Sequence, residues 1–167
     1  MFVLGIDPGL TRCGYGAVES GPGGELRAAA AGVLTTAPTA PLPARLAQLQ
    51  AALRSLLDEL GPEAVAVERV FFSANARTAM AVGQASGLAL AEAAAAGCEV
   101  AQYTPNEVKV AVAGAGAAPK EQVIRMIQSL LSLPTPPRPA DAADALALAV
   151  CHHACAPLQR RVAGALR

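Results

Sequence analysis

Four acidic residues are the strongest candidates for chemistry in this sequence. Asp7 and Glu68 each close a short uncharged run, and Asp141 and Asp144 lie three residues apart near the C-terminus. On a helix that spacing places both carboxylates on one face, with Cβ atoms roughly 5–6 Å apart. Taken singly, Asp7 fits an ordinary Asp-Pro-Gly turn, and Asp141 fits the first turn of a helix, where the helix dipole favours an acid. Glu68 is less ordinary, because a carboxylate after Ala-Val-Ala-Val is expected to be buried and then needs a partner or a cation.

Taken together, these carboxylates predict a metal site. Four such groups at one place would repel each other strongly without cations. Hard oxygen ligands in this number suit Mg²⁺ or Mn²⁺. Two ions about 4 Å apart would activate a water molecule and stabilise the leaving oxygen of a phosphodiester. The residues therefore favour a divalent-metal-dependent nuclease with two ions in each active site.

The two lysines of the chain form a second candidate group. Of thirteen basic residues, eleven are Arg, and only Lys109 and Lys120 are Lys. They flank the small-residue turn Gly114-Ala115-Gly116, which would allow the chain to lie close to a DNA backbone. A compact ammonium group near a scissile phosphate is one reason to use Lys here. The ordinary alternative is a solvated helix surface, which is the usual place for Lys.

Hydrophobic periodicity and turn residues predict the elements that must position these side chains. Gly-Pro-Gly-Gly at 21–24 joins two of the strands, and Gly61-Pro62 ends the first helix. The expected strands are Phe2–Asp7, Cys13–Glu19, Leu26–Thr36, Ala64–Glu68 and Glu99–Tyr103. The expected helices are Pro41–Leu60, Ala74–Ala96, Pro105–Ala113, Pro119–Leu133 and Ala140–Ala156.

This order predicts an α/β fold with a five-stranded mixed sheet flanked by helices. The first and fourth strands both end in acids, and active sites of such sheets often lie at the C-terminal ends of strands. The length of 167 residues suits one domain, which we place at residues 1–157, with a short C-terminal tail at residues 158–167.

Composition narrows the class of protein. Hydrophobic residues make up 53% and charged residues 16%, so the chain is globular and not disordered. The longest uncharged stretches fall short of a membrane span, and we expect a cytoplasmic protein without a membrane segment. A net charge of zero argues weakly against simple nucleic-acid binding, but a local basic patch is compatible with it. The run Cys151-His152-His153-Ala154-Cys155 matches no standard zinc spacing and fits a buried helix better.

Four segments together resemble one protein family. They are GIDPGLTRCGYG, AVERVFFSANARTAMAVGQASG, NEVKVAVAGAGAAPKEQV and PADAADALALAVCHHA. In order and spacing they are similar to RuvC, the bacterial Holliday-junction resolvases, over nearly the whole chain. The resemblance implies a ribonuclease-H-like fold and an endonuclease that resolves four-way DNA junctions by symmetric paired nicks during homologous recombination and DNA repair.

The resemblance also implies roles for particular residues. Asp7, Glu68, Asp141 and Asp144 match the catalytic metal-binding acids, and Lys109 and Lys120 match basic residues that support catalysis and bind phosphate. Phe71 matches an aromatic residue that stacks on a base at the junction. We expect Arg69 and Arg77, in the same segment, to contact DNA. The family works as a homodimer together with the RuvA–RuvB branch-migration complex.

A dimer surface is expected on the predicted helix 74–96. Two symmetric nicks need two active sites, which an isologous dimer supplies. Gly83 and Gly87 lie one turn apart on this helix, and the lack of side chains there lets another backbone approach. The alternative is that this face packs on the protein's own sheet.

Two other functions are compatible with parts of the sequence. The pattern D-x-G-x-T at Asp7, Gly9 and Thr11 also occurs in ATPases of the actin and sugar-kinase superfamily. Those proteins need two related lobes, for which 167 residues are too few, but a single-lobe relative that acts in RNA processing or binds ATP fits the length. A non-catalytic DNA-binding or scaffold protein is disfavoured because all four acids are present.

Overall fold

A computed structural model describes residues 1–69 and 76–165, with side chains for 1–69 and 78–157. The chain opens with three antiparallel strands, β1 (Phe2–Asp7), β2 (Arg12–Ser20) and β3 (Leu26–Thr35). Helix α1 (Leu42–Leu60) leads to β4 (Ala64–Glu68), and α2 (Ala76–Ala95) leads to β5 (Glu99–Tyr103). Helices α3 (Pro105–Ala113), α4 (Lys120–Leu130) and α5 (Ala140–Ala165) complete the fold.

The predicted five-stranded mixed sheet is confirmed. Its strand order is β3-β2-β1-β4-β5, with β4 and β5 parallel to β1 and the other pairs antiparallel. Parallel pairing brings the C-terminal ends of β1 and β4 to the same edge of the sheet. The sheet therefore places the ends of the two acid-terminated strands side by side.

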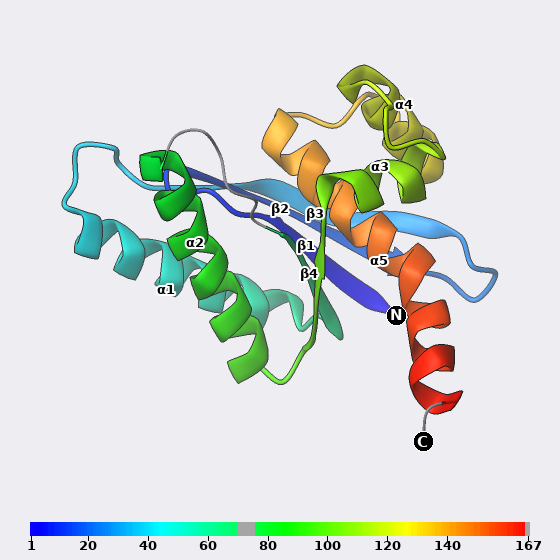
Figure 1. Ribbon diagram of the computed structural model, residues 1–167, viewed down its shortest axis with the longest axis horizontal. Coiled ribbons are helices and arrows are strands. Elements are labelled where there is room, and N and C mark those ends of the chain that lie inside the picture. The colour runs from blue at the N-terminus through cyan, green and yellow to red at the C-terminus, as the bar shows by residue number, and fades with distance from the viewer. Residues whose placement is uncertain (70–75, 166–167) are drawn as a thin grey trace.

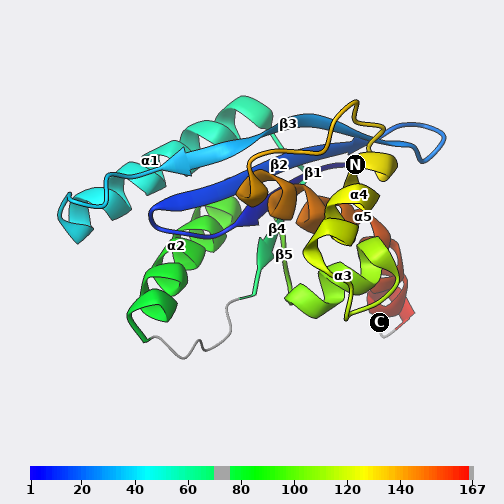
Figure 2. The same ribbon diagram turned by 90° about the horizontal axis from the view of Figure 1, so that it is seen from above.

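The sheet lies between two layers of helices (Figures 1 and 2). Helices α1 and α2 cover one face, where Leu49 and Leu53 meet strand residues such as Leu4 and Val65 in one core cluster. Helices α3, α4 and α5 cover the other face, where Ile127 and Leu146 belong to a second cluster. Side chains alternate between the two faces along each strand, so a central strand contributes residues to both core clusters. The central strands are therefore uninterrupted apolar runs.

Two helix ends differ from the predicted ones by more than one residue. Helix α4 ends at Leu130 instead of Leu133, because Ser132 takes a left-handed backbone with φ 51° and the Leu133 N–H bonds to the Gln128 carbonyl at 2.9 Å. Such a 6→1 bond closes a helix C-terminus without continuing it. Helix α5 passes Pro157 and runs to Ala165, beyond the predicted end at Ala156. Among the described residues, no helix combines the length and apolar character needed to cross a membrane.

Candidate active site

Asp7 and Glu68 meet at one edge of the sheet. The printed register of β1 and β4 ends with Ile6 opposite Val67, so the next residue on each strand is the acid. Both carboxyl groups are half-buried, and they lie within hydrogen-bonding range of each other. The sequence led us to expect an acid at the end of each of these strands, and the structure shows in addition that the two strands are parallel neighbours.

Helix α5 brings the other two acids to this edge because β1 and β2 lack side chains where the helix crosses them. A Cβ at Gly5 would overlap the carbonyl oxygen of Ala145, and one at Gly14 would overlap the carbonyl oxygen of Asp141. A Cβ at Gly16 would lie 2.7 Å from the backbone nitrogen of Leu146. Glycine at these places lets the helix backbone rest directly on the strands.

These glycines were missed in the sequence, although a signal for them exists. Gly14 and Gly16 are two apart on one strand, so they share one face of the sheet. They pair across the ladder with Asp7 and Gly5, respectively. A glycine repeat of period two next to an acid is the pattern that marks a close helix crossing.

The clustering of acids changes their ionisation. Burial, followed by the negative charges of Glu68, Asp144 and Asp141, raises the pKa of Asp7 to about 7, and Lys120 opposes this shift. Burial and the charge of Asp144 also raise the pKa of Glu68. A carboxylate that resists ionisation in this way is stabilised when a cation arrives.

Two side chains of the protein supply positive charge to the cluster. Lys120 Nζ lies 2.6 Å from Asp144 Oδ2. Arg12 holds Asp141 Oδ2 through Nε at 3.0 Å and a terminal nitrogen at 2.7 Å. Lys120 was expected near the phosphate site, whereas the pairing of Arg12 with Asp141 was not predicted.

A pocket of about 270 Å³ joins the cluster to both lysines. Its lining includes the acids Glu68 and Asp144 together with Lys109 and Lys120. The structure therefore brings both predicted lysines next to the predicted acids, although α3 and α4 carry them on separate elements. An arrangement of paired carboxylates and ammonium groups around an open pocket suits a phosphate ester.

The donor set fits divalent metal ions in its chemistry. The four acids offer only carboxylate oxygens, which Mg²⁺ and Mn²⁺ prefer. Within residues 1–69 and 78–157, whose side chains the structure describes, no three His, Cys, Asp or Glu side chains converge closely enough to hold an ion as they stand. Two of the four acids are paired with basic side chains instead, Asp141 with Arg12 and Asp144 with Lys120.

The remaining predicted residues are placed unevenly. Phe71 lies outside the described residues, and so does the side chain of Arg77. Arg69 directly follows β4; its backbone N–H donates to the Tyr103 carbonyl at 2.8 Å and the residue is exposed. Gly83 and Gly87 are exposed, with no atom within 4 Å of an added Cβ. The alternative that these glycines pack on the sheet is wrong.

Ala85, Ala89 and Ala93 form the side of α2 that packs on the sheet. All three are buried, and they belong to the core cluster that α1 and α2 share with the strands. The glycine side of the helix is thus left open.

The cysteine and histidine run on α5 has a structural role. His152 is fully buried, and its Nδ1 forms a 3.0 Å hydrogen bond with the Tyr103 hydroxyl. His153 Nε2 meets the Val18 carbonyl at 3.1 Å. The cysteines of the chain are free thiols. The interpretation as a buried helix and not a zinc site agrees with these contacts.

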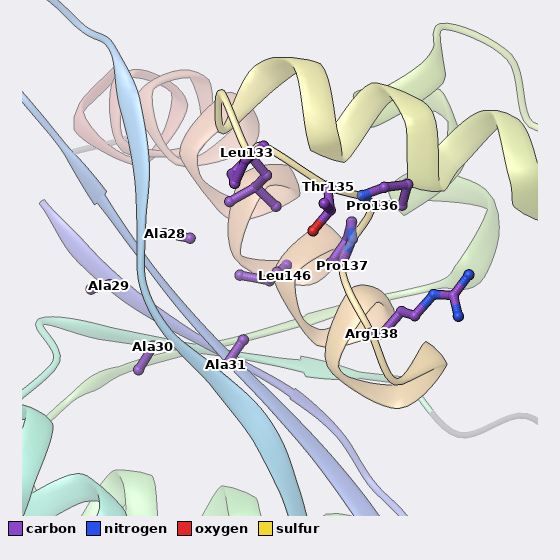
Figure 3. Close-up of a pocket in the computed structure, with 11 residues that line it drawn as sticks. Ala28, Ala29, Ala30, Ala31, Leu133, Thr135, Pro136, Pro137, Arg138 and Leu146 are labelled. Atoms are coloured by element: carbon purple, nitrogen blue, oxygen red, sulfur yellow. The ribbon is translucent and has the colours of Figure 1, made fainter.

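A larger cavity lies away from the acids. It measures about 690 Å³ and lies between the edge strand β3 and the loop that joins α4 to α5 (Figure 3). Its walls are mainly alanines 28–31 and the proline-rich run 133–138, and Arg138 is its one charged lining residue. A wall of this kind lacks the groups that hydrolysis needs, so the smaller pocket beside the acids is the candidate active site.

Comparisons with known proteins identify the family that this chain resembles. The family model described as "Crossover junction endodeoxyribonuclease RuvC" matches residues 3–152. A protein of that name from Salinispora arenicola is 55% identical over 152 residues, which cover 91% of this chain and 87% of the relative. Another from Moorella thermoacetica is 52% identical and covers 96% of each chain.

Solved structures give the same answer. The structure of T. thermophilus RuvC in complex with a Holliday junction substrate matches with a TM-score of 0.86 and 38% identity, covering 95% of this chain and 96% of that one. The yeast mitochondrial Holliday junction resolvase Ydc2 matches with a TM-score of 0.71 at 15% identity, a likeness of fold alone.

These matches support the nuclease and not the ATP-binding or RNA-processing alternative. They also agree with the expected ribonuclease-H-like fold. Dependence on divalent metal ions is general among these nucleases. The chain belongs to the RuvC family of crossover junction endodeoxyribonucleases.

Proposed function

We propose that this chain cuts four-way DNA junctions by metal-assisted hydrolysis at the cluster of Asp7, Glu68, Asp141 and Asp144. The observation that carries the proposal is the meeting of these acids at the sheet edge, beside a pocket that Glu68, Asp144 and both lysines line. Relatives with about half their residues identical bear the name of junction endonucleases, and a similar structure holds a junction substrate. The location that fits a DNA substrate in a bacterial cell is the cytoplasm.

The four acids would hold Mg²⁺ or Mn²⁺, and we expect two ions. When bound, such ions supply activation of the attacking water and charge stabilisation at the leaving oxygen of the phosphodiester. Asp7 is the acid with most to gain from a cation, because burial and three neighbouring acids oppose its ionisation. Asp141 and Asp144 would have to turn from Arg12 and Lys120 to act as ligands.

The lysines serve the phosphate in this proposal. Lys109 and Lys120 line the same pocket as Glu68 and Asp144, so their ammonium groups are available to neutralise the non-bridging oxygens of a bound phosphate. Lys120 already donates to Asp144, which places its charge within the catalytic cluster. Its exchange of Asp144 for a phosphate oxygen would stabilise the growing charge as the phosphorus–oxygen bond breaks.

DNA contacts beyond the pocket are expected from the segment that follows β4. We assign base stacking to Phe71, and backbone contacts to Arg69 and Arg77. A stacked aromatic ring holds an unpaired base without reading its sequence, at about 1–3 kcal/mol per base. The exposure of Arg69 at the end of β4, beside Glu68, supports its part of this assignment.

We propose a homodimer through the open side of α2. Gly83 and Gly87 leave this side free of large groups, and the opposite side of the helix is already used by the core. A two-fold dimer would present two active sites to a nearly two-fold symmetric junction, so that paired nicks arise from one encounter. The RuvA–RuvB complex is the expected partner that delivers the junction.

The test is a nicking assay on a synthetic four-way junction. We expect cleavage only with added divalent metal, symmetric cuts on opposing strands, and little cutting of a linear duplex of the same sequence. Junction cleavage that persists in excess EDTA, or equal cleavage of linear duplex, would contradict the proposal. Titration with ATP provides a separate check on the discarded ATPase function.

A further inference from the structure

A second open pocket adjoins the acidic cluster and begins directly after the strand that carries Asp7. It measures about 450 Å³ and is formed by the turn that joins β1 to β2, by α1 and by α2. Its polar groups are Thr11, Arg12, Arg45 and Thr78, and its apolar wall includes Leu10 and Val82. Two guanidinium groups beside an apolar wall suit a nucleotide, with its phosphate on the arginines and its sugar on the wall.

Arg45 is held in place for such a ligand. Its Nε donates to the Thr36 hydroxyl at 2.9 Å, and a terminal nitrogen donates to the Thr11 hydroxyl at 2.7 Å. Thr36 is buried, and its hydroxyl donates to the Leu10 carbonyl at 2.6 Å. The turn and Arg45 thus form one connected unit, and the remaining N–H groups of the guanidinium can bind a phosphate.

Arg12 belongs to both the pocket and the acidic cluster. It lines the pocket, yet its guanidinium holds Asp141 through two nitrogens. The side chain is 49% exposed, so solvent and ligands reach it. This arginine therefore links a predicted metal-binding acid to the second pocket.

We propose that Arg12 exchanges partners when DNA binds: its guanidinium moves from Asp141 to a backbone phosphate of the strand to be cut, held in this pocket with Arg45. The inference rests on the proposed function, because it takes the junction as the ligand. The strand then has an anchor on each side of the cluster, with the lysines of the first pocket on one side and the arginines on the other.

The exchange couples DNA binding to metal binding. In the free protein Arg12 occupies Asp141, and no three acids of the described chain converge on one point. A phosphate of the bound DNA is an alternative anion for the Arg12 guanidinium. When Arg12 moves to that phosphate, the carboxylate of Asp141 becomes free to bind a metal ion. By reciprocity the metal ion, by displacing Arg12 from Asp141, favours phosphate binding to the same degree.

The experiment compares Arg12→Ala with Arg27→Ala, which removes an exposed arginine from β3. Two measurements need no cleavage: Mn²⁺ binding to the DNA-free protein by calorimetry, and anisotropy of a labelled four-way junction in EDTA over a range of salt. We expect Arg12→Ala to raise Mn²⁺ affinity by up to about fivefold, the factor for one half-exposed ion pair. We expect its salt slope for junction binding to fall by about one unit, as for one lost phosphate contact.

A neutral methylphosphonate identifies the phosphate. Placed next to the cut site on the side that faces the second pocket, it should weaken wild-type binding more than it weakens Arg12→Ala binding, because only Arg45 still contacts that phosphate in the variant. Arg12→Lys should keep the wild-type salt slope, which shows that the fold and the charge are intact. Thermal melting of each variant completes the comparison.

Each outcome decides the question. If Arg12→Ala binds Mn²⁺ more tightly but binds the junction like Arg27→Ala, Arg12 only restrains Asp141 and the exchange is wrong. If junction binding falls with no gain in Mn²⁺ affinity, the two sites are not coupled and the exchange is again wrong. If the wild-type protein neither binds nor cuts junctions, the proposed function fails instead.

Discussion

Gly14 lies opposite Asp7 in the β1–β2 ladder, and a Cβ at Gly14 would overlap the carbonyl oxygen of Asp141. The absence of one side chain thus sets how near α5 comes to the strand that carries the first acid. The close crossing is a condition of the site, because Asp141 and Asp144 depend on the start of α5 for their place.

Gly14→Ala should therefore separate the two halves of the acidic cluster. The added methyl group pushes α5 from β2, and we expect a loss of about 1–3 kcal/mol in the free energy of unfolding, as for other overpacked cores. Cleavage should fall much more than the stability loss explains. Gly23→Ala is the matched control, since its Cβ would meet only the side chain of Glu25. Normal cleavage by Gly14→Ala would show that the crossing tolerates displacement.

The four acids should be needed for cleavage but not for binding. Asp7→Asn, Glu68→Gln, Asp141→Asn and Asp144→Asn should each lower single-turnover cleavage by roughly two to three orders of magnitude, as when one directly stabilising group is lost. Junction affinity should persist, because phosphate contacts provide most of it. Near-normal cleavage by the Asp7 and Glu68 variants together would refute the assignment.

Asp7 should make the metal-free protein less stable as pH rises. Its pKa is raised from 3.8 to about 7, so folding disfavours its ionised form. Asp7 therefore contributes fully to the free energy of unfolding below pH 4, and this contribution is lost as the pH rises through 7. In EDTA at pH 8, the melting temperature of Asp7→Asn should be higher than that of the wild type. At pH 4 the two melting temperatures should be equal. Added Mg²⁺ at pH 8 should make the wild type the more stable of the two. Asp58→Asn, an exposed acid on α1, should show no such crossover.

Lys109→Ala and Lys120→Ala should slow the chemical step more than they weaken binding. Both ammonium groups line the pocket beside Glu68 and Asp144, where charge develops during hydrolysis. Single-turnover rates at saturating protein separate this effect from affinity. Arg125→Ala removes an exposed charge from the same helix as Lys120 and should cut at the normal rate. Equal rates for all three variants would rule out the catalytic role.

Gly83→Leu with Gly87→Leu should yield a folded monomer. Both glycines have open space where a side chain would begin, so the fold of one chain should tolerate the change. A dimer in which two backbones pack closely at this side of α2 should not tolerate the two leucine side chains. Sedimentation should show the loss of dimer, and the junction assay should show single nicks in place of paired ones. A fully dimeric double variant would place the interface elsewhere.

Local signals in the sequence were enough to predict the strands, the helices and the acids at the strand ends. Uninterrupted apolar runs define β1 and β4, and turn residues such as Gly61 mark where helices end. These signals are local, because they depend on side chains within a few residues of each other. Asp7 and Glu68 follow such runs directly, so their positions at strand ends were predictable.

The ion pairs of the site, in contrast, depend on the tertiary packing of segments that lie far apart in the sequence. Arg12 and Asp141 are separated by 129 positions along the chain, and Lys120 and Asp144 by 24. Neither pairing has a periodic signature, since each depends on where α5 crosses the sheet and how α4 packs beside it. The open side of α2 could not be predicted from the sequence either, because glycines fit a buried crossing and an exposed surface equally well. Ala85 and Ala89 pack on the sheet, and this packing leaves Gly83 and Gly87 facing outward.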